Sequence, residues 1–78
     1  MPKIKAYTLA TCPFCIKLKA FFKENNIKFE NIDVGVDKKA REEMIKKSGQ
    51  IGTPVIDIDG EIIIGFEKET LKKKLGIR

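Results

Sequence analysis

The sequence predicts an α/β fold in which a four-stranded mixed sheet carries helices on both faces. Stretches that alternate apolar and polar residues, as strands do, are separated by stretches with apolar residues at helical spacing. The dipeptide Asp59-Gly60 joins the last two strand-like stretches, and it is the strongest short-range signal for a tight hairpin. A strand–helix–strand unit makes a parallel pair and the hairpin an antiparallel one, so the sheet is mixed.

The first two expected elements are a strand from Lys3 to Leu9 and a helix that ends at about Asn25. Thr11-Cys12-Pro13 is a helix start, because a small polar residue precedes a proline, which fits the first helical turn. Apolar residues then recur on one helical face, at Phe14, Leu18, Phe21 and Phe22.

The middle of the chain predicts a second strand from Lys28 to Asp33 and a second helix through Lys47. Asp37 is a good N-cap for that helix, and Ser48-Gly49 is a typical stop. The helix carries its apolar residues on one face, at Ala40, Met44 and Ile45.

The last third predicts two strands, Val55 to Ile58 and Glu61 to Ile64, joined by a type I′ turn with positive φ at both central residues. Gly65-Phe66-Glu67 then opens a last helix, which ends at Gly76. The order strand, helix, strand, helix, strand, strand, helix is the minimal arrangement of the thioredoxin fold. We expect it to occupy residues 1–78 as one domain.

Composition and charge limit the classes of partner that we expect for this chain. The chain begins with Met1-Pro2 and patterned sequence, with no apolar run long enough for a signal peptide or a membrane span, so we expect a cytoplasmic protein without a membrane partner. The net charge of +5 is spread over lysines interleaved with glutamates, which is typical of a solvated surface. A nucleic-acid partner is therefore not expected. Attraction of anionic partners, such as glutathione or acidic protein surfaces, remains the alternative.

Cys12-Pro13-Phe14-Cys15 lies where the first strand gives way to the first helix. The thiolate is the species that attacks a disulfide, and the positive end of a helix dipole stabilises it. We therefore expect Cys12, at or near the N-cap, to be the attacking residue. Cys15, inside the first turn, is the expected resolving residue. Phe14 is expected to be an exposed apolar contact for substrate.

A cysteine pair with this spacing has two other uses in proteins, metal binding and a structural disulfide. Zinc needs about four ligands, and the chain offers two cysteines and no histidine, so no metal is expected in a monomer. A dimer that shares zinc or an iron–sulfur cluster through Cys12 remains an alternative. A purely structural disulfide would close a very short loop and would constrain the unfolded chain little. Redox chemistry is therefore favoured.

Two further segments carry possible site chemistry. Pro54 begins the third strand, beside the expected end of the first. A cis bond there would turn the Thr53 backbone toward Cys12, where it could pair with a substrate peptide as an added strand; the alternative is a simple turn. Gly65-Phe66-Glu67 at a helix start is a possible carboxylate site, and otherwise an ordinary glycine turn.

The chain resembles the glutaredoxin family over nearly its whole length. The resemblance is carried by three segments together, which are Tyr7–Cys15, Arg41–Gly49 and Thr53-Pro54. The resemblance implies a thioredoxin fold with Pro54 in cis. It also implies a dithiol oxidoreductase that reduces protein or glutathione mixed disulfides, with glutathione as co-substrate. We expect it to act as a monomer.

The same resemblance implies where glutathione would bind. The Thr53 backbone would pair with the glutathione cysteine. The backbone of Phe66 and Glu67, after Gly65, would hold the γ-glutamyl carboxylate. Gln50 would lie near the glycyl carboxylate.

Two positions depart from the family pattern. Leu9 stands three residues before Cys12, where many glutaredoxins have lysine or arginine. Gly65-Phe66-Glu67 stands where the family often has Gly-Gly or Gly-Cys with an aspartate, and its Gly-Phe is similar to the small ribonucleotide-reductase redoxins. Those proteins take electrons from thioredoxin reductase. A redoxin linked to thioredoxin reductase, supplying electrons to a reductase, is therefore the alternative function.

Overall fold

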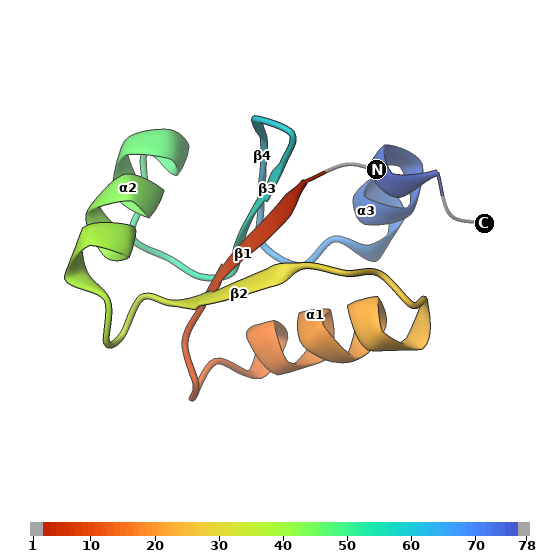
Figure 1. Cartoon of the computed structure of the whole chain (residues 1–78), viewed down its shortest axis with the longest axis horizontal. Helices are drawn as coiled ribbons and strands as arrows, with labels where there is room; N and C mark the ends of the chain where they lie inside the picture. The colour runs from red at the N-terminus through yellow and green to blue at the C-terminus, as the bar shows by residue number, and fades with distance from the viewer. Residues whose placement is uncertain (1–2, 77–78) are drawn as a thin grey trace.

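The computed structural model describes residues 3–76, which form a four-stranded sheet and three helices (Figure 1). Their kinds and order confirm the predicted thioredoxin fold. The elements run as follows: β1 (Ile4–Thr8), α1 (Pro13–Glu24), β2 (Glu30–Asp33), α2 (Lys38–Ser48), β3 (Val55–Ile58), β4 (Glu61–Ile64) and α3 (Lys68–Leu75).

The strands are arranged in the order β2-β1-β3-β4. β1 and β2 are parallel, with Lys5 opposite Glu30, while β3 is antiparallel to both β1 and β4. β1 and β3 are therefore the two central strands. The C-terminal end of β1 and the N-terminal end of β3 lie at the same edge, because Tyr7 pairs with Val55. This pairing positions the candidate site.

The sheet separates two apolar layers. On one face, α1 and α3 pack Leu18, Phe22 and Leu71 against Ile56. On the other face, α2 packs Met44 and Ala40 against residues of β1 and β3. Figure 1 shows α2 apart from α1 and α3, on opposite sides of the strands. No helix within residues 3–76 is long and apolar enough to cross a membrane.

Local chemistry accounts for the expected boundaries. Asp37 caps α2 through a 3.0 Å hydrogen bond that its Oδ1 accepts from the Ala40 N–H, and Gly49 ends the helix in the left-handed region at φ 74°. Asp59 and Gly60 have φ values of 51° and 91°, which confirms positive φ at both turn positions.

Two predicted boundaries are wrong by more than one residue. The second strand begins at Glu30 rather than Lys28, because Phe29 tucks into the core first, with its ring 4.7 Å from that of Phe22. The last helix begins at Lys68 rather than Gly65, whose φ of 79° is not helical. The other ends shift by one residue: β1 is shorter at both ends, α1 ends at Glu24 and α2 at Ser48.

Candidate active site

Cys12 is the N-cap of α1, as the sequence predicts. Its backbone is extended (φ −84°, ψ 114°), its N–H donates to the Leu9 carbonyl at 3.2 Å, and Pro13 follows at the first helical position. Proline is suited to that position because it has no N–H to leave unpaired. The strand end and the helix start thus fix Cys12 at the edge of the sheet, partly exposed.

The pKa of the Cys12 thiol is lowered from its ordinary value. Partial burial by itself raises it, but hydrogen bonds from the side chains of Cys15 and Thr53 and from the backbone of Cys15 and Phe14 together outweigh that effect. The Cys15 N–H lies 3.2 Å from the Cys12 sulfur. A sulfur that accepts N–H groups at a helix start favours the thiolate form.

Cys15 has the opposite environment. Its side chain has no solvent exposure and lies in the first turn of α1. Burial, followed by the hydrogen bond with Cys12, raises the pKa of its thiol. The structure therefore brings together one accessible thiol with a lowered pKa and one enclosed thiol with a raised pKa.

Thr53 lies next to Cys12 in the structure, although the two residues are far apart in the sequence. The Thr53-Pro54 peptide bond is cis, and the Thr53 carbonyl oxygen lies 3.9 Å from the Cys12 sulfur. Because a carbonyl only accepts, this contact suits the thiol form of Cys12 and weakens when the thiolate forms. Pro54 is buried and Thr53 is partly exposed. The prediction that Thr53 faces Cys12 agrees with this geometry.

The α3 segment differs from the expectation. Glu67 is the N-cap, so the four free N–H groups at this helix start belong to Glu67, Lys68, Glu69 and Thr70, and not to Phe66. The Glu67 carboxylate accepts a 3.0 Å hydrogen bond from the Thr70 hydroxyl. A carboxylate site at this helix would therefore use the N–H groups of Glu67 and the residues after it, rather than that of Phe66.

Phe66 is partly buried and packs against the core on the side of the sheet that α1 covers. Its ring makes an edge contact with Phe21 at 5.9 Å between centroids. The turn before it is made by Gly65, whose N–H donates to the Pro54 carbonyl at 2.9 Å. This bond links the start of the α3 segment to the cis proline.

Gln50 and Phe14 lie in two different parts of the structure. The Gln50 side chain lies against Gly52, in the loop that leads from α2 to Thr53. Phe14 is 56% exposed on the first turn of α1, as predicted, and the Lys17 ammonium lies 5.5 Å from its ring centre. Leu9 packs with the apolar residues under α2.

Sequence reasoning missed a polar network around Lys47, which it treated as part of a solvated face. Its Nζ donates to Asp57 at 2.8 Å and to the buried Tyr7 hydroxyl at 3.1 Å, and it pairs with Glu43 at 3.0 Å. The available signal was Asp57 itself, a carboxylate inside an otherwise apolar strand that requires a partner. The network fastens α2 to β1 and β3.

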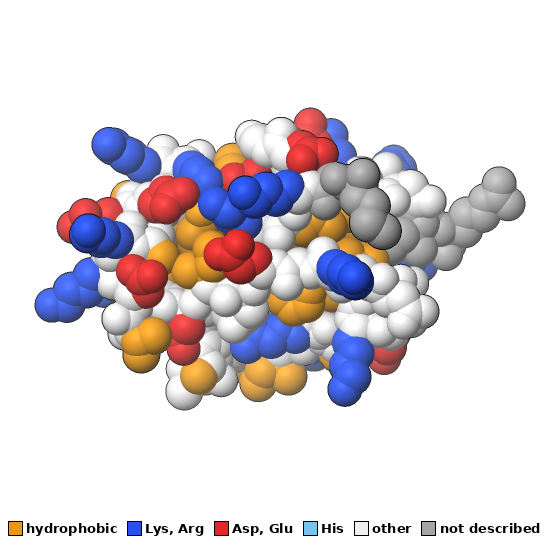
Figure 2. Space-filling model, in the orientation of Figure 1, with side chains coloured by type: hydrophobic (Ala, Val, Ile, Leu, Met, Phe, Trp, Pro, Cys, Tyr) orange, Lys and Arg blue, Asp and Glu red, His pale blue; other side chains and the backbone are white. Residues whose placement is uncertain are grey.

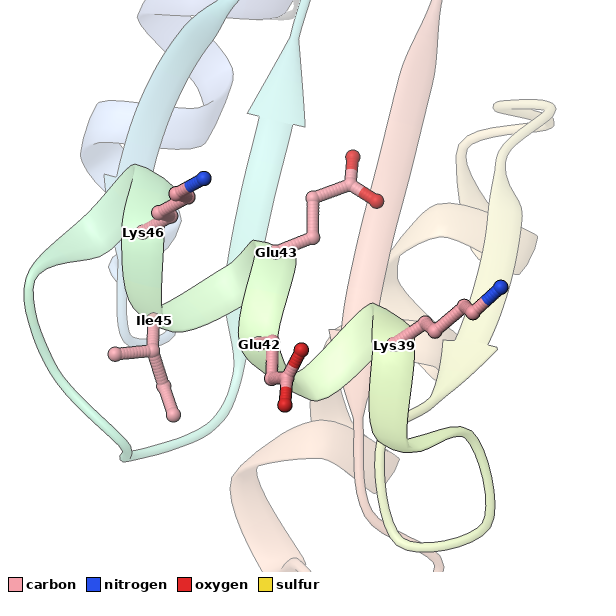
Figure 3. A pocket seen from close by; sticks show the side chains of 5 residues that line it. All are labelled: Lys39, Glu42, Glu43, Ile45 and Lys46. Atoms are coloured by element: carbon pink, nitrogen blue, oxygen red, sulfur yellow. The ribbon is translucent and has the colours of Figure 1, made fainter.

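The face shown in Figure 2 is mixed in charge, because basic and acidic side chains are interleaved on it rather than gathered. A hollow of about 590 Å³ on α2 is lined by Lys39, Glu42, Glu43, Ile45 and Lys46, whose side chains diverge in Figure 3. These five lining residues include no cysteine, serine or threonine. Among residues 3–76, no three histidine, cysteine or acidic side chains are grouped to hold a metal ion.

Known proteins match this chain in sequence over most of its length. The family model described as Glutaredoxin matches residues 4–63. A glutaredoxin-like 8.6 kDa protein in the rubredoxin operon of Clostridium pasteurianum is 50% identical over 70 residues, covering 90% of this chain and 93% of that protein. Glutaredoxin 3 of Escherichia coli K12 is 37% identical over 67 residues, covering 86% of this chain and 81% of the relative.

Solved structures of similar proteins superpose well on this chain. The glutaredoxin of Archaeoglobus fulgidus superposes with a TM-score of 0.87 at 29% identity, covering 96% of this chain and 87% of that one. The thioredoxin-like protein BC3987 superposes with a TM-score of 0.85 at 39% identity, covering 91% and 97%.

Proposed function

The chain belongs to the glutaredoxin family, and on that premise we propose that it is a dithiol oxidoreductase that reduces mixed disulfides of proteins or of glutathione. The observation that carries the proposal is the contrast between its two thiols. Cys12 is accessible and its pKa is lowered, whereas Cys15 is enclosed and its pKa is raised. An attacking and a resolving cysteine need these two environments.

The reaction is two thiol–disulfide exchanges. The Cys12 thiolate attacks one sulfur of the substrate disulfide, the other sulfur leaves and takes up a proton, and a mixed disulfide remains on Cys12. Cys15 then loses its proton and attacks the Cys12 sulfur, which releases the second substrate thiol. The protein ends with a Cys12–Cys15 disulfide, and its two electrons have reduced the substrate.

The raised pKa of Cys15 suits the second exchange. In that exchange Cys12 is the sulfur attacked and the substrate sulfur is the leaving group. Cys15 has a raised pKa, so it is the more strongly nucleophilic sulfur once it is deprotonated. Burial also keeps Cys15 from attacking external disulfides first.

Glutathione is the co-substrate that we propose, since glutaredoxins use it. A redoxin that takes electrons from thioredoxin reductase is the second candidate, and two observations favour it. Leu9 packs under α2 where the family often has a cation, and Phe66 packs against Phe21 where the family often has a small residue. Both changes alter the expected glutathione contacts.

One experiment separates these candidates. The oxidised protein is supplied with NADPH and either glutathione plus glutathione reductase or thioredoxin reductase alone, and NADPH consumption is followed. Turnover only with glutathione supports a working glutaredoxin, and turnover only with thioredoxin reductase supports the second candidate. If NADPH is consumed with neither reductant system, the proposed chemistry is wrong.

Variants test the roles of the two sulfurs. Cys12→Ser should abolish turnover in both systems. Cys15→Ser should accumulate protein mixed disulfides on Cys12, which non-reducing electrophoresis and mass spectrometry detect. Full activity of Cys12→Ser would overturn the assignment.

We also propose that the protein works in the cytoplasm as a monomer. The support is chemical: two thiols must be returned to the reduced state after each cycle, and cytoplasmic reductants do this. Cell fractionation and analytical ultracentrifugation test the two statements.

A further inference from the structure

A surface of aromatic and cationic side chains runs from Cys12 along α1 to the start of α3; we call it the α1–α3 patch. It consists of Phe14, Lys17, Phe66 and Lys68. The Lys17 ammonium lies 5.5 Å from the centre of the Phe14 ring. Lys17 and Lys68 line one hollow of about 240 Å³, whose other lining residues include Ala20, Phe21, Glu24 and Phe66.

The α1–α3 patch lies next to Cys12, where a protein substrate must contact the surface. Cys12 caps the helix, and Phe14 is 56% exposed in the first turn of that helix. A stable protein partner covers about 800 Å² on each side. A partner whose disulfide sits on the Cys12 sulfur therefore covers Phe14 and approaches Lys17, one turn further along α1.

The α1 half of the patch, next to Cys12, is one-sided in charge, whereas Lys68 at the start of α3 stands between Glu67 and Glu69. The first turn of α1 has no acidic residue. Glu24 lines the hollow too, but it lies seven residues beyond Lys17 along the helix, about 10 Å further from Cys12. In the described part of the chain, Lys47 and Lys74 take part in ion pairs with glutamate or aspartate, whereas Lys17 and Lys68 do not.

We propose that the α1–α3 patch docks protein partners whose reactive cysteine is flanked by acidic and apolar residues. The apolar flank packs on Phe14 and Phe66, and the carboxylates lie against the ammonium groups of Lys17 and Lys68. This inference rests on the proposed function and names the class of protein disulfide that the same Cys12 reduces. Complementary charge raises the encounter rate and fixes orientation more than it raises affinity.

The test compares two disulfide-linked peptides that share a core and differ only in flanking residues, Asp-Glu in one and Gln-Gln in the other. Each is mixed with reduced protein in single-turnover stopped flow, with no glutathione present. Wild type should reduce the acidic peptide faster than the neutral one. Lys17→Glu should lower the rate for the acidic peptide by about fivefold, because a single exposed charge has a modest effect and charge reversal doubles it.

A matched control is available at the far end of the sheet. Lys28 is exposed in the α1–β2 connection, and Lys28→Glu changes the net charge by the same amount. It should leave the ratio of acidic to neutral rates as in wild type. The proposal is overturned if Lys17→Glu keeps the wild-type ratio, or if Lys28→Glu lowers the ratio equally, because net charge alone would then explain the result.

Two further measurements separate docking from chemistry. Bis(2-hydroxyethyl) disulfide is small and neutral, so its rate should be the same in wild type and Lys17→Glu; a parallel loss would place Lys17 in the chemistry and overturn the docking role. Peptides with serine in place of cysteine report docking even if no disulfide is turned over. In a ¹⁵N NMR titration, the acidic serine peptide should shift the amides of Phe14, Lys17 and Lys68, and an absence of such shifts overturns the proposal whether or not the chain is a reductase.

Discussion

The backbone nitrogen of Cys15 lies 3.2 Å from the sulfur of Cys12, within the turn that Pro13 begins. The same residue thus supplies a hydrogen bond that favours the Cys12 thiolate and a sulfur that is kept away from solvent. The order of attack in the proposed reaction follows from this one turn of helix.

The first prediction concerns alkylation of the reduced protein by iodoacetamide. Because the pKa of Cys12 is lowered, its thiolate should form at a pH below the ordinary cysteine pKa of about 8.5. The rate of alkylation at Cys12 should therefore reach half its maximum below that pH. Cys15 should react later and at higher pH, since its pKa is raised. Peptide mapping by mass spectrometry from pH 4 to 10 measures both. Faster labelling of Cys15, or a Cys12 midpoint at or above the ordinary value, would contradict the assignment.

The position of Cys12 was predictable because its determinants are local. A cap, a proline and a run of helical residues all lie within a few positions of the cysteine, so the pattern indicates where the helix begins. The Asp59-Gly60 turn was predictable for the same reason. The glutaredoxin resemblance, which rests on three such segments, is confirmed by the family match.

The missed features depend on contacts between distant residues. Lys47 and Asp57 are on different elements, and no spacing rule connects a helix lysine with a strand carboxylate. The predicted start of α3 was wrong because Phe66 packs on Phe21 in the segment before the helix, which begins at Lys68. Tertiary packing of this kind overrides local preference.

The second prediction concerns Asp57→Asn. The Asp57 side chain is only 12% exposed; burial raises its pKa, but the hydrogen bonds from Lys47 and the Gly60 N–H outweigh burial and lower it. A carboxyl with a lowered pKa stabilises the fold above its unfolded pKa of about 3.9, and the effect is lost as pH falls through the folded value. The variant should therefore lose about 1–2 kcal/mol of unfolding free energy at pH 7 and less than that at pH 2. Urea unfolding at both pH values measures the difference.

The exposed ion pair between Lys74 and Glu61 provides the control. Its side chains are 42% and 53% exposed, so Lys74→Met should cost less than about 0.5 kcal/mol at pH 7. Equal losses in Asp57→Asn and Lys74→Met would mean that the Lys47 network has no special role in holding α2.

The third prediction compares two glycines in the loops near Cys12. A Cβ on Gly35 would lie 3.0 Å from both Leu9 Cδ2 and Asp33 Oδ1, whereas a Cβ on Gly52 meets nothing nearer than 3.6 Å. Gly35→Ala should therefore lose about 1 kcal/mol, or about 4–8 °C in Tm, because Leu9 and Asp33 must move. Gly52→Ala should be near neutral or slightly stabilising. Thermal unfolding of both variants decides it, and equal Tm values would show that the loop yields without cost.

The last prediction concerns Leu9→Lys. Leu9 is only partly buried, so a lysine can lay its stem on the residues under α2 and extend its ammonium into solvent near Cys12. The added charge should lower the pKa of Cys12 further and attract the glutathione carboxylates. We expect kcat/KM with glutathione to rise about fivefold at low salt, which is the effect of roughly 1 kcal/mol, and to fall back at high salt. Leu9→Met keeps the shape without the charge and should show neither change. If Leu9→Lys and Leu9→Met behave alike, the missing cation at this position does not limit the use of glutathione, and the preference for reductant must be set at Phe66 and the start of α3.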